Sequence, residues 1–343
     1  MSNAQPASSQ GGRLFLRLLP GLLITVVATG ALFYFVDIDS LKEAFSLADY
    51  QWMPLVVVVF LGTLAARTQA WRTLLEERAS YRNCFLILNQ AYLLNNVLPF
   101  RLGELGRALL LSSQSKISFW NVLSTVIVER VFDLGIAAAL LLSTLPLVIG
   151  SEWAQPVALL TAAFVLIGFA LLFLMAKYPE RALQLFNKLF ARLPLAQEFI
   201  SGKLSSFLEG LSSLKDGSRF LRVGFWMLLA WFFNVAWYYV LMRGFFQDAR
   251  WLWAFFSIAV ASLGVALPSS PAYIGVLEGA MVASLSLFGT DPSISLAYAI
   301  VAHAIYLVIT GILGIIGFWL QGNSLRNVYR RLLARRQLGE VGE

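Results

Sequence analysis

Long apolar runs alternate with short polar segments along the chain, and the lengths of these runs predict its helices. A helix needs roughly 18 to 20 apolar residues to cross the hydrocarbon core of a bilayer. Runs of this kind occupy residues 18–36, 54–71, 131–149, 156–176, 221–241 and 295–320. The pattern therefore predicts about six full transmembrane helices.

Two further apolar stretches are broken near their middle by proline. Residues 85–116 contain Pro99, and residues 252–289 contain Pro268 and Pro271. Proline lacks a backbone donor and disfavours helical geometry in the residue before it, so each stretch predicts two short helices. We interpret each as a re-entrant helical hairpin, although two full spans in each stretch would also return the chain to its starting side.

Basic residues are concentrated in one set of loops and are scarce in the other. Four arginines (Arg67, Arg72, Arg78 and Arg82) lie near or beyond the end of the second span, eight Lys or Arg residues lie between 177 and 222, and five follow the last span. The loops expected on the opposite side hold only Lys42, Arg243 and Arg250. Because Lys and Arg are retained in cytoplasmic loops, both termini are predicted to be cytoplasmic, and the two hairpins then enter from opposite sides.

The predicted elements occur in the same order in both halves: two spans, a hairpin and a span. Since the halves have opposite orientation, the fold class is predicted as an all-α polytopic membrane protein arranged as an inverted repeat. Its parts are a disordered tail at 1–12, membrane repeat A at 13–150 with hairpin 85–116, membrane repeat B at 151–320 with an amphipathic cytoplasmic connector at 180–220 and hairpin 252–289, and a basic cytoplasmic tail at 321–343.

Composition agrees with this class and narrows the chemistry. Hydrophobic residues make up 59% of the chain and charged residues 13%, with a mean hydropathy of +0.73. The net charge of +7 is explained by basic rims against anionic leaflets, so no nucleic acid partner is expected. With Cys84 and His303 as the single cysteine and histidine, we expect no intramolecular disulfide, metal site or cofactor.

The first hairpin carries charge just after its proline. Arg101, Glu104 and Arg107 fall at i, i+3 and i+6 on one broad face of the second half-helix, and Gly103 permits close backbone approach. Charged residues at membrane depth are expensive, and two arginines around one carboxylate leave positive charge suited to a phosphate. The structural alternative is that both arginines snorkel to the headgroups while Glu104 pairs with them.

A second charged cluster opens the next span. Glu129, Arg130 and Asp133 lie on one side of a helix, where they can pair internally or with Arg101 and Arg107. The cluster is either a salt-bridge network that holds the hairpin to the span or a set of substrate contacts.

The second hairpin and the last span each contribute one polar candidate. Glu278 has no basic neighbour in sequence, so it either pairs with a distant arginine or carries a proton. His303 lies in the middle of the last span, where it is either a functional group or a partner in a helix–helix hydrogen bond.

Other polar residues near the first hairpin have simpler interpretations. Arg67 and Arg72 flank the cytoplasmic end of a span beside Trp71 and are expected to be interfacial anchors. Asn95, like Asn89 and Asn96, either lines a cavity or caps the broken backbone.

The runs NQAYLLNNVLPFRLGELGR, VERVFD and LPSSPAYIGVLEG resemble the membrane domain of lysylphosphatidylglycerol synthases, a family that includes the flippase part of the multiple peptide resistance factor and stand-alone flippase-like proteins. The resemblance covers about 15–320. The residues that match the family's motifs, and to which it implies a substrate-binding role, are Arg101, Gly103, Glu104, Arg107, Glu129, Arg130, Asp133, Gly275 and Glu278. Two departures leave substrate choice open: Ser270-Pro271-Ala272-Tyr273 replaces a common Pro-Gly-Gly turn, and His303 stands where arginine is common.

The resemblance implies a stand-alone lipid transporter or flippase in a prokaryotic cytoplasmic membrane. An anionic phospholipid or polyprenyl phosphate would be the substrate, and protons are a candidate coupling ion. The aminoacyl transfer of the family belongs to a separate soluble domain, which we do not expect in the roughly 20 residues after the last span.

Two other classes of function stay open from the sequence. An intramembrane enzyme acting on lipid head groups is disfavoured, because no nucleophile lies beside a base, so no catalytic residue is expected. A non-transporting partner of a cell-envelope lipid or glycan enzyme, or a homo-oligomer, is also compatible with the chain.

Overall fold

The computed structural model describes residues 37–98, 102–150, 154–189, 214–266 and 271–323. Within these ranges the secondary structure is helical and contains no strand. The predicted tail at 1–12, the first span at 18–36 and most of the basic tail lie outside the described residues, as do Pro99, Arg101 and Pro268.

Four of the described helices are long and apolar enough to cross a membrane. They are α3 (Met53–Leu74, preceded by the short helix η1, Tyr50–Trp52), α6 (Phe119–Ile149), α10 (Gly217–Met242) and α13 (Pro292–Leu320). Each covers one of the spans predicted from apolar length. A further helix of 24 residues, α7 (Ala154–Lys177), covers the predicted span 156–176.

The two proline-broken stretches each form a pair of short helices. The first pair is α4 (Tyr81–Val97) and α5 (Leu102–Gln114); the second is α11 (Trp251–Gly264) and α12 (Val276–Ser286), with the short helix η4 (Pro271–Tyr273) between them. The members of each pair pack against one another. α4 ends because Leu98, the residue before Pro99, has extended backbone angles. The prediction that each stretch forms two short helices is therefore confirmed.

Two shorter helices lie at the ends of this arrangement. The side chain of Asp37 accepts a hydrogen bond from Ser40 N and caps α2 (Ile38–Leu47). α8 (Pro179–Leu189) has an acidic first turn and a basic last turn, and all of it but its first residue lies in the predicted connector at 180–220. The remainder of that connector between 190 and 213 lies outside the described part of the chain.

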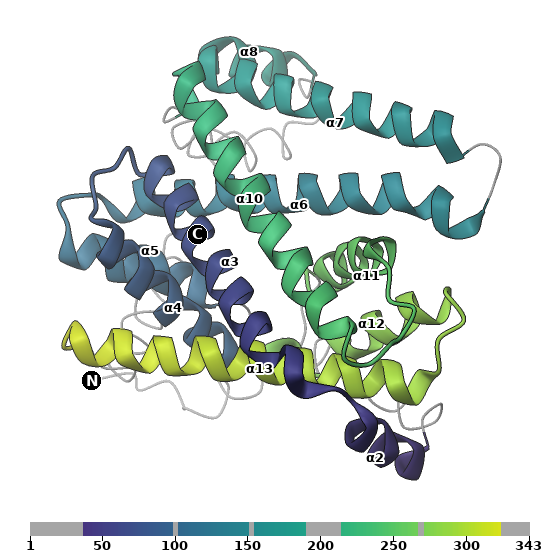
Figure 1. The fold of residues 1–343 in the computed structure, drawn as a ribbon. Helices are drawn as coiled ribbons and strands as arrows, with labels where there is room; N and C mark the ends of the chain where they lie inside the picture. Colours follow the sequence, from purple (N-terminus) through teal and green to yellow (C-terminus); the bar gives the residue numbers. More distant parts are fainter. Residues whose placement is uncertain (1–36, 99–101, 151–153, 190–213, 267–270, 324–343) are drawn as a thin grey trace, which may run out of the picture.

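The helices pack in a pattern that links the two halves of the sequence (Figure 1). α3 and α10 pack against each other at the centre. α4 packs on α13, and α11 packs on α6. α5 packs on α6, α12 packs on α13, and α7 runs back along α6.

Glycines bring α4 and α13 close together. A Cβ added at Gly314 would lie 2.6 Å from the Cβ of Leu93 and 2.8 Å from the carbonyl oxygen of Asn89. Small residues at a helix contact allow this approach, which is a common device in membrane proteins. The contact holds the first hairpin against the last helix, and side chains of both face the interior cavity described next.

Candidate functional site

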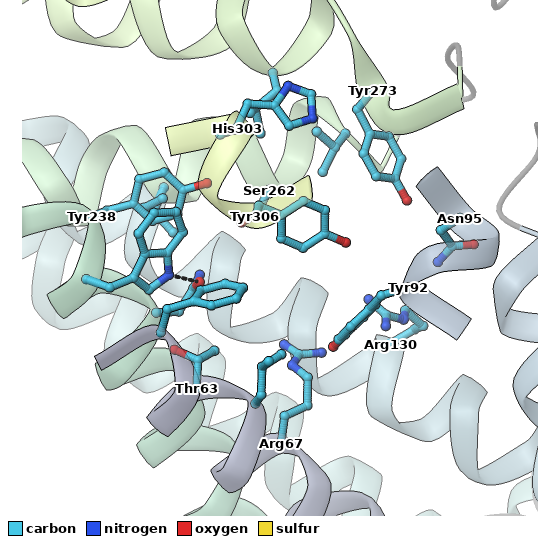
Figure 2. A pocket seen from close by; sticks show the side chains of 18 of the residues that line it. Thr63, Arg67, Tyr92, Asn95, Arg130, Tyr238, Ser262, Tyr273, His303 and Tyr306 are labelled. Atoms are coloured by element: carbon cyan, nitrogen blue, oxygen red, sulfur yellow. Dashed lines mark hydrogen bonds between the residues drawn. The ribbon is translucent and has the colours of Figure 1, made fainter. Parts of the chain in front are cut away.

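A cavity of about 190 Å³ lies inside the helix bundle. Its lining comes from both halves of the chain, because α3, α4, α5 and α6 contribute residues to it, as do α10, α11, α12 and α13. Figure 2 shows Arg67 and Arg130 at one end of this cavity and His303 and Tyr273 at the other. Tyr92, Tyr238 and Tyr306 also line it, so the site combines basic groups with aromatic and hydroxyl groups.

Arg67 forms the best-defined ion pair at the basic end of the cavity. Its two terminal nitrogens reach the two carboxylate oxygens of Asp133 at 2.8 and 2.7 Å, and Nη1 also lies 3.1 Å from Glu129 Oε1. Such paired hydrogen bonds fix the plane of the guanidinium. The interpretation of Arg67 as an interfacial anchor is wrong, because α3 continues to Leu74 and places this side chain inside the bundle.

Arg107 is held more deeply and does not line the cavity. It is 1% exposed, its Nη2 lies 2.7 Å from Glu129 Oε2, and its guanidinium stacks over the Trp71 ring at 3.7 Å. The Trp71 indole in turn donates to Thr125 Oγ1 at 3.2 Å. A buried arginine with a carboxylate and an aromatic face has its charge compensated, so the geometry gives Arg107 a positioning role toward Glu129.

Arg130 connects α5 to α6. Its Nε lies 3.1 Å from Glu104 Oε1, and its Nη1 lies 3.1 Å from Asp133 Oδ2. Asp133 Oδ1 also accepts a hydrogen bond of 3.1 Å from Trp231 Nε1. The predicted pairing of Arg130 with Asp133, and of Glu129 with Arg107, is thus confirmed. The pairing expected for Glu104 is corrected, because this carboxylate pairs with Arg130 and not with Arg107. These ion pairs link α5 to α6.

The charges of this cluster are balanced within the described part of the chain. Arg67, Arg107 and Arg130 face Glu104, Glu129 and Asp133, three cations and three anions. The surplus of positive charge expected from sequence depended on Arg101, which lies outside the described residues. Arg67 and Arg130 are the two arginines of the cluster that line the cavity.

The polar residues of the first hairpin stabilise its broken backbone. Asn95 Oδ1 accepts a hydrogen bond of 2.8 Å from Gly103 N at the start of α5, and Asn95 also lines the cavity, so both interpretations of this residue are confirmed. A Cβ at Gly103 would lie 2.1 Å from the carbonyl oxygen of Ala91. Gly103 therefore allows α5 to approach α4, and it does not line the cavity.

Glu278 and His303 meet at the other end of the cavity. His303 Nδ1 lies 2.5 Å from Glu278 Oε1, and Glu278 Oε2 accepts a hydrogen bond of 2.8 Å from Gly275 N at the start of α12. Gly275 has φ of +83°, which glycine adopts without strain. The structure thus brings a basic partner to Glu278 from 25 residues further along the chain. His303 lines the cavity, and its Nε2 is buried without a hydrogen-bond partner among the described residues.

The described residues contain no group of three or more His, Cys, Asp or Glu side chains arranged to hold a metal ion. The carboxylates of the basic end are occupied by arginines instead. The polar groups that line the cavity include arginine, histidine, tyrosine and asparagine side chains.

Comparison with known proteins identifies the chain's family. Residues 18–314 match the lysylphosphatidylglycerol synthase transmembrane region. The chain belongs to this family. As a member of the lysylphosphatidylglycerol synthase transmembrane family, it is a multi-pass membrane protein with relatives in archaea.

Three curated relatives are similar at modest identity. Glycosyltransferase AglD of Haloferax volcanii is 25% identical over 89% of this chain and 54% of its own length, so the chain spans about half of that relative. A UPF0104 membrane protein of Methanothermobacter thermautotrophicus is 23% identical over 85% of this chain and 90% of its own length. A UPF0104 membrane protein of Methanocaldococcus jannaschii is 26% identical over 66% of this chain and 93% of its own length. No solved structure matches the chain.

In this lysylphosphatidylglycerol synthase transmembrane family member, sequence reasoning missed Arg67 and the tyrosines of the cavity. One signal for Arg67 was available, since it lies within the apolar run 54–71 and not beyond its end. The tyrosines carried no such signal, because aromatic residues are frequent throughout the chain. Arg72 also follows Trp71 in sequence, but its Nε donates to the carbonyl oxygen of Ala79 at 3.2 Å, outside the cavity.

Proposed function

We propose that this protein transports a lipid with an anionic head group, phospholipid or polyprenyl phosphate, across the bilayer, and that Arg67 and Arg130 bind its phosphate. The observation that carries the proposal is the position of these two arginines in an interior cavity lined by both halves of the chain. Arginine suits this role because its planar fork of donors matches phosphate oxygens. Membership of the lysylphosphatidylglycerol synthase transmembrane family supports a lipid as the substrate.

We further propose that the fold is an inverted repeat with two re-entrant hairpins. The packing supports this arrangement, because exchanging the halves maps two pairs of contacts onto each other: α4 on α13 becomes α11 on α6, and α5 on α6 becomes α12 on α13. The α3–α10 contact maps onto itself. A cavity on such an axis is reached from either side when the halves rock against each other, which is the basis of alternating access.

The distribution of basic residues supports a topology with both termini in the cytoplasm, and the archaeal relatives support a prokaryotic cytoplasmic membrane. We propose that the lipid is moved without chemical change. In this proposal the Thr63 hydroxyl that lines the cavity does not act as a nucleophile, since it donates to the carbonyl oxygen of Val59 in its own helix, at 3.5 Å. His303 Nδ1 is engaged by Glu278, and in this proposal the pair carries the coupling proton.

Lipid translocation in proteoliposomes tests this proposal. The assay would compare the translocation rates of three lipids: fluorescent phosphatidylglycerol, fluorescent phosphatidylcholine and a polyprenyl phosphate. Each rate would be measured for the natural protein, Arg67→Gln and Arg130→Gln. Arg243→Gln is the control, because Arg243 is exposed at the far end of α10 and is absent from the cavity lining. We expect the natural protein to move an anionic lipid faster than empty liposomes do. The rate should fall at least ten-fold in the two cavity variants and stay unchanged in the control. Equal rates in folded natural protein and empty liposomes for all three lipids would refute transport.

A second candidate function is that of a non-transporting partner for an enzyme that modifies lipids or glycans of the cell envelope. The similarity to Glycosyltransferase AglD favours it, because that relative is about twice as long as the part it shares with this chain. In that case the cavity arginines would be dispensable for a bound enzyme's activity. Neutralising Arg67 without effect on glycan assembly in cells, in protein that still folds, would favour the partner over the transporter.

A further inference from the structure

A second cavity of about 240 Å³ adjoins the first where α6, α10 and α11 meet. Arg67 and Arg130 line both cavities, together with Asn234, Ser262 and Val265. The two arginines therefore lie at the junction of the two spaces. A group bound between the two arginines is therefore adjacent to both cavities.

The chemistry of the second cavity changes from its inner to its outer end. Asp133 and Trp231 lie at the inner end, joined by a hydrogen bond of 3.1 Å beside the arginines. Leu134, Ala137 and Ala266 supply the rest of the wall. Leu134 is 47% exposed, and on a helix that crosses a bilayer an exposed leucine faces lipid chains.

We infer that this second cavity is a lateral portal that holds one hydrocarbon chain of a lipid whose phosphate lies between Arg67 and Arg130. The inference rests on the proposed function and specifies how the lipid sits in the site. Charge at the inner end and apolar side chains at the outer end match the two ends of such an amphiphile. Leu134 is the exposed residue of this wall, whereas Ala137 is buried and Ala266 is half-buried, and the small side chains of the two alanines fill little of the space behind Leu134.

The portal also explains how a long lipid uses so small an interior cavity. The first cavity needs to enclose only the head group, because the hydrocarbon chain stays among apolar groups throughout. A free phosphate or a water-soluble glycerol phosphate would occupy the arginine junction without filling the portal. Occupancy of the portal therefore distinguishes a phosphate carried by a lipid from a phosphate on a soluble molecule.

Photo-crosslinking in proteoliposomes tests the portal directly. A phosphatidylglycerol with a diazirine in one acyl chain would be activated, and the labelled peptides identified by mass spectrometry. We expect labelling of α6 around Leu134 and of α11 near Ala266, reduced at least five-fold by Arg67→Gln. The matched control is the lipid-facing surface of α13 at Ile312 and Ile315, both exposed, where labelling should not depend on Arg67. The portal would be overturned if Arg67→Gln reduced labelling equally at the α6–α11 surface and at α13, or reduced it at neither.

A blocking experiment supplies a second and independent readout. Leu134→Cys would be alkylated with a bulky thiol reagent, and Leu147→Cys, 52% exposed on the same helix, serves as the control. The natural Cys84 is buried and does not compete for the reagent in folded protein. We expect at least a five-fold loss of lipid transport for the first adduct, little change for the second, and unchanged binding of glycerol phosphate by both.

The two proposals fail in different ways. If no lipid moves in any sample but acyl labelling of α6 and α11 depends on Arg67, transport is refuted and the portal stands. If lipid moves but the adduct at Leu134 has no effect and labelling there matches α13, the portal is refuted and transport stands.

Discussion

Replacing Glu129 by glutamine should destabilise the protein more than any other single change in the charged cluster. Glu129 is 0% exposed, and its two oxygens lie 3.1 Å from Arg67 Nη1 and 2.7 Å from Arg107 Nη2. The substitution preserves size and shape and removes one negative charge. Arg107, 1% exposed, would then keep the Trp71 ring and a neutral amide beside it but no anionic partner among the residues that the structure describes.

The magnitude follows from two opposing effects. Two unit charges about 4 Å apart attract by about 4 kcal/mol at an effective dielectric constant of about 20. Glu129 makes two pairs closer than this, with Arg67 and Arg107, and a third with Arg130 at 3.9 Å, but its own burial offsets part of the attraction. Breaking a buried pair by removing one partner costs about 3–5 kcal/mol, because the remaining charge is left uncompensated. We expect a loss of that size for Glu129→Gln.

Unfolding in mixed micelles, followed by helical circular dichroism as SDS is raised, would measure this loss. Glu43→Gln is the control, since Glu43 is exposed on α2, and a change within about 0.5 kcal/mol is expected there. The double variant Arg107→Met with Glu129→Gln should regain at least half of the loss, because both buried charges are then removed. A loss below about 1 kcal/mol for Glu129→Gln, or no recovery in the double variant, would refute the buried pair.

Three further predictions use the same unfolding measurement or a simple labelling rate. Gly314→Ala should lose about 1–3 kcal/mol because its Cβ would meet Leu93 and α4, whereas Gly311→Ala, which meets nothing within 4 Å, should lose none; equal effects would contradict the close α4–α13 contact. Asn95→Ala should lose about 1–3 kcal/mol by leaving the Gly103 N–H without its acceptor, and an unchanged midpoint would contradict that cap. Cys84 is buried, so a thiol probe should react only on unfolding; rapid reaction in native micelles would contradict its burial.

Much of the helical structure was predictable because it depends on local properties. Apolar length alone located α3, α6, α10 and α13, since a helix that crosses a bilayer must satisfy its own backbone. Proline located the break after α4 for an equally local reason, since the residue before it is extended. The prolines of the second stretch likewise indicated two short helices there, which are α11 and α12. The distribution of charge between loops is also local, which is why a topology was predicted even though no tertiary contact was known.

The site was predictable only where its partners share a helix. Arg130 and Asp133 are one turn apart on α6, and their pairing follows from helix geometry. Arg67 and Asp133 are 66 residues apart, and their pairing depends on how α3 is rotated against α6. Arg107 is buried and not in the cavity because of the way α5 approaches α4 at Gly103. The periodicity of the sequence does not predict how α5 is rotated against α4.

The balance of charge in the cluster bears on how a phosphate would bind and leave. With no phosphate bound, Arg67 is neutralised by Asp133, and Arg130 by Glu104 and Asp133, so the described site carries no net charge at membrane depth. A phosphate that enters the arginine junction must compete with these carboxylates for the same donors, which limits its affinity and permits release. Loss of Asp133 alone should therefore tighten phosphate binding while slowing transport, because a carrier that holds its substrate too firmly spends longer in the loaded state. Binding of glycerol phosphate to Asp133→Asn, measured by calorimetry beside its transport rate, separates this role from a structural one: a purely structural Asp133 would weaken both together.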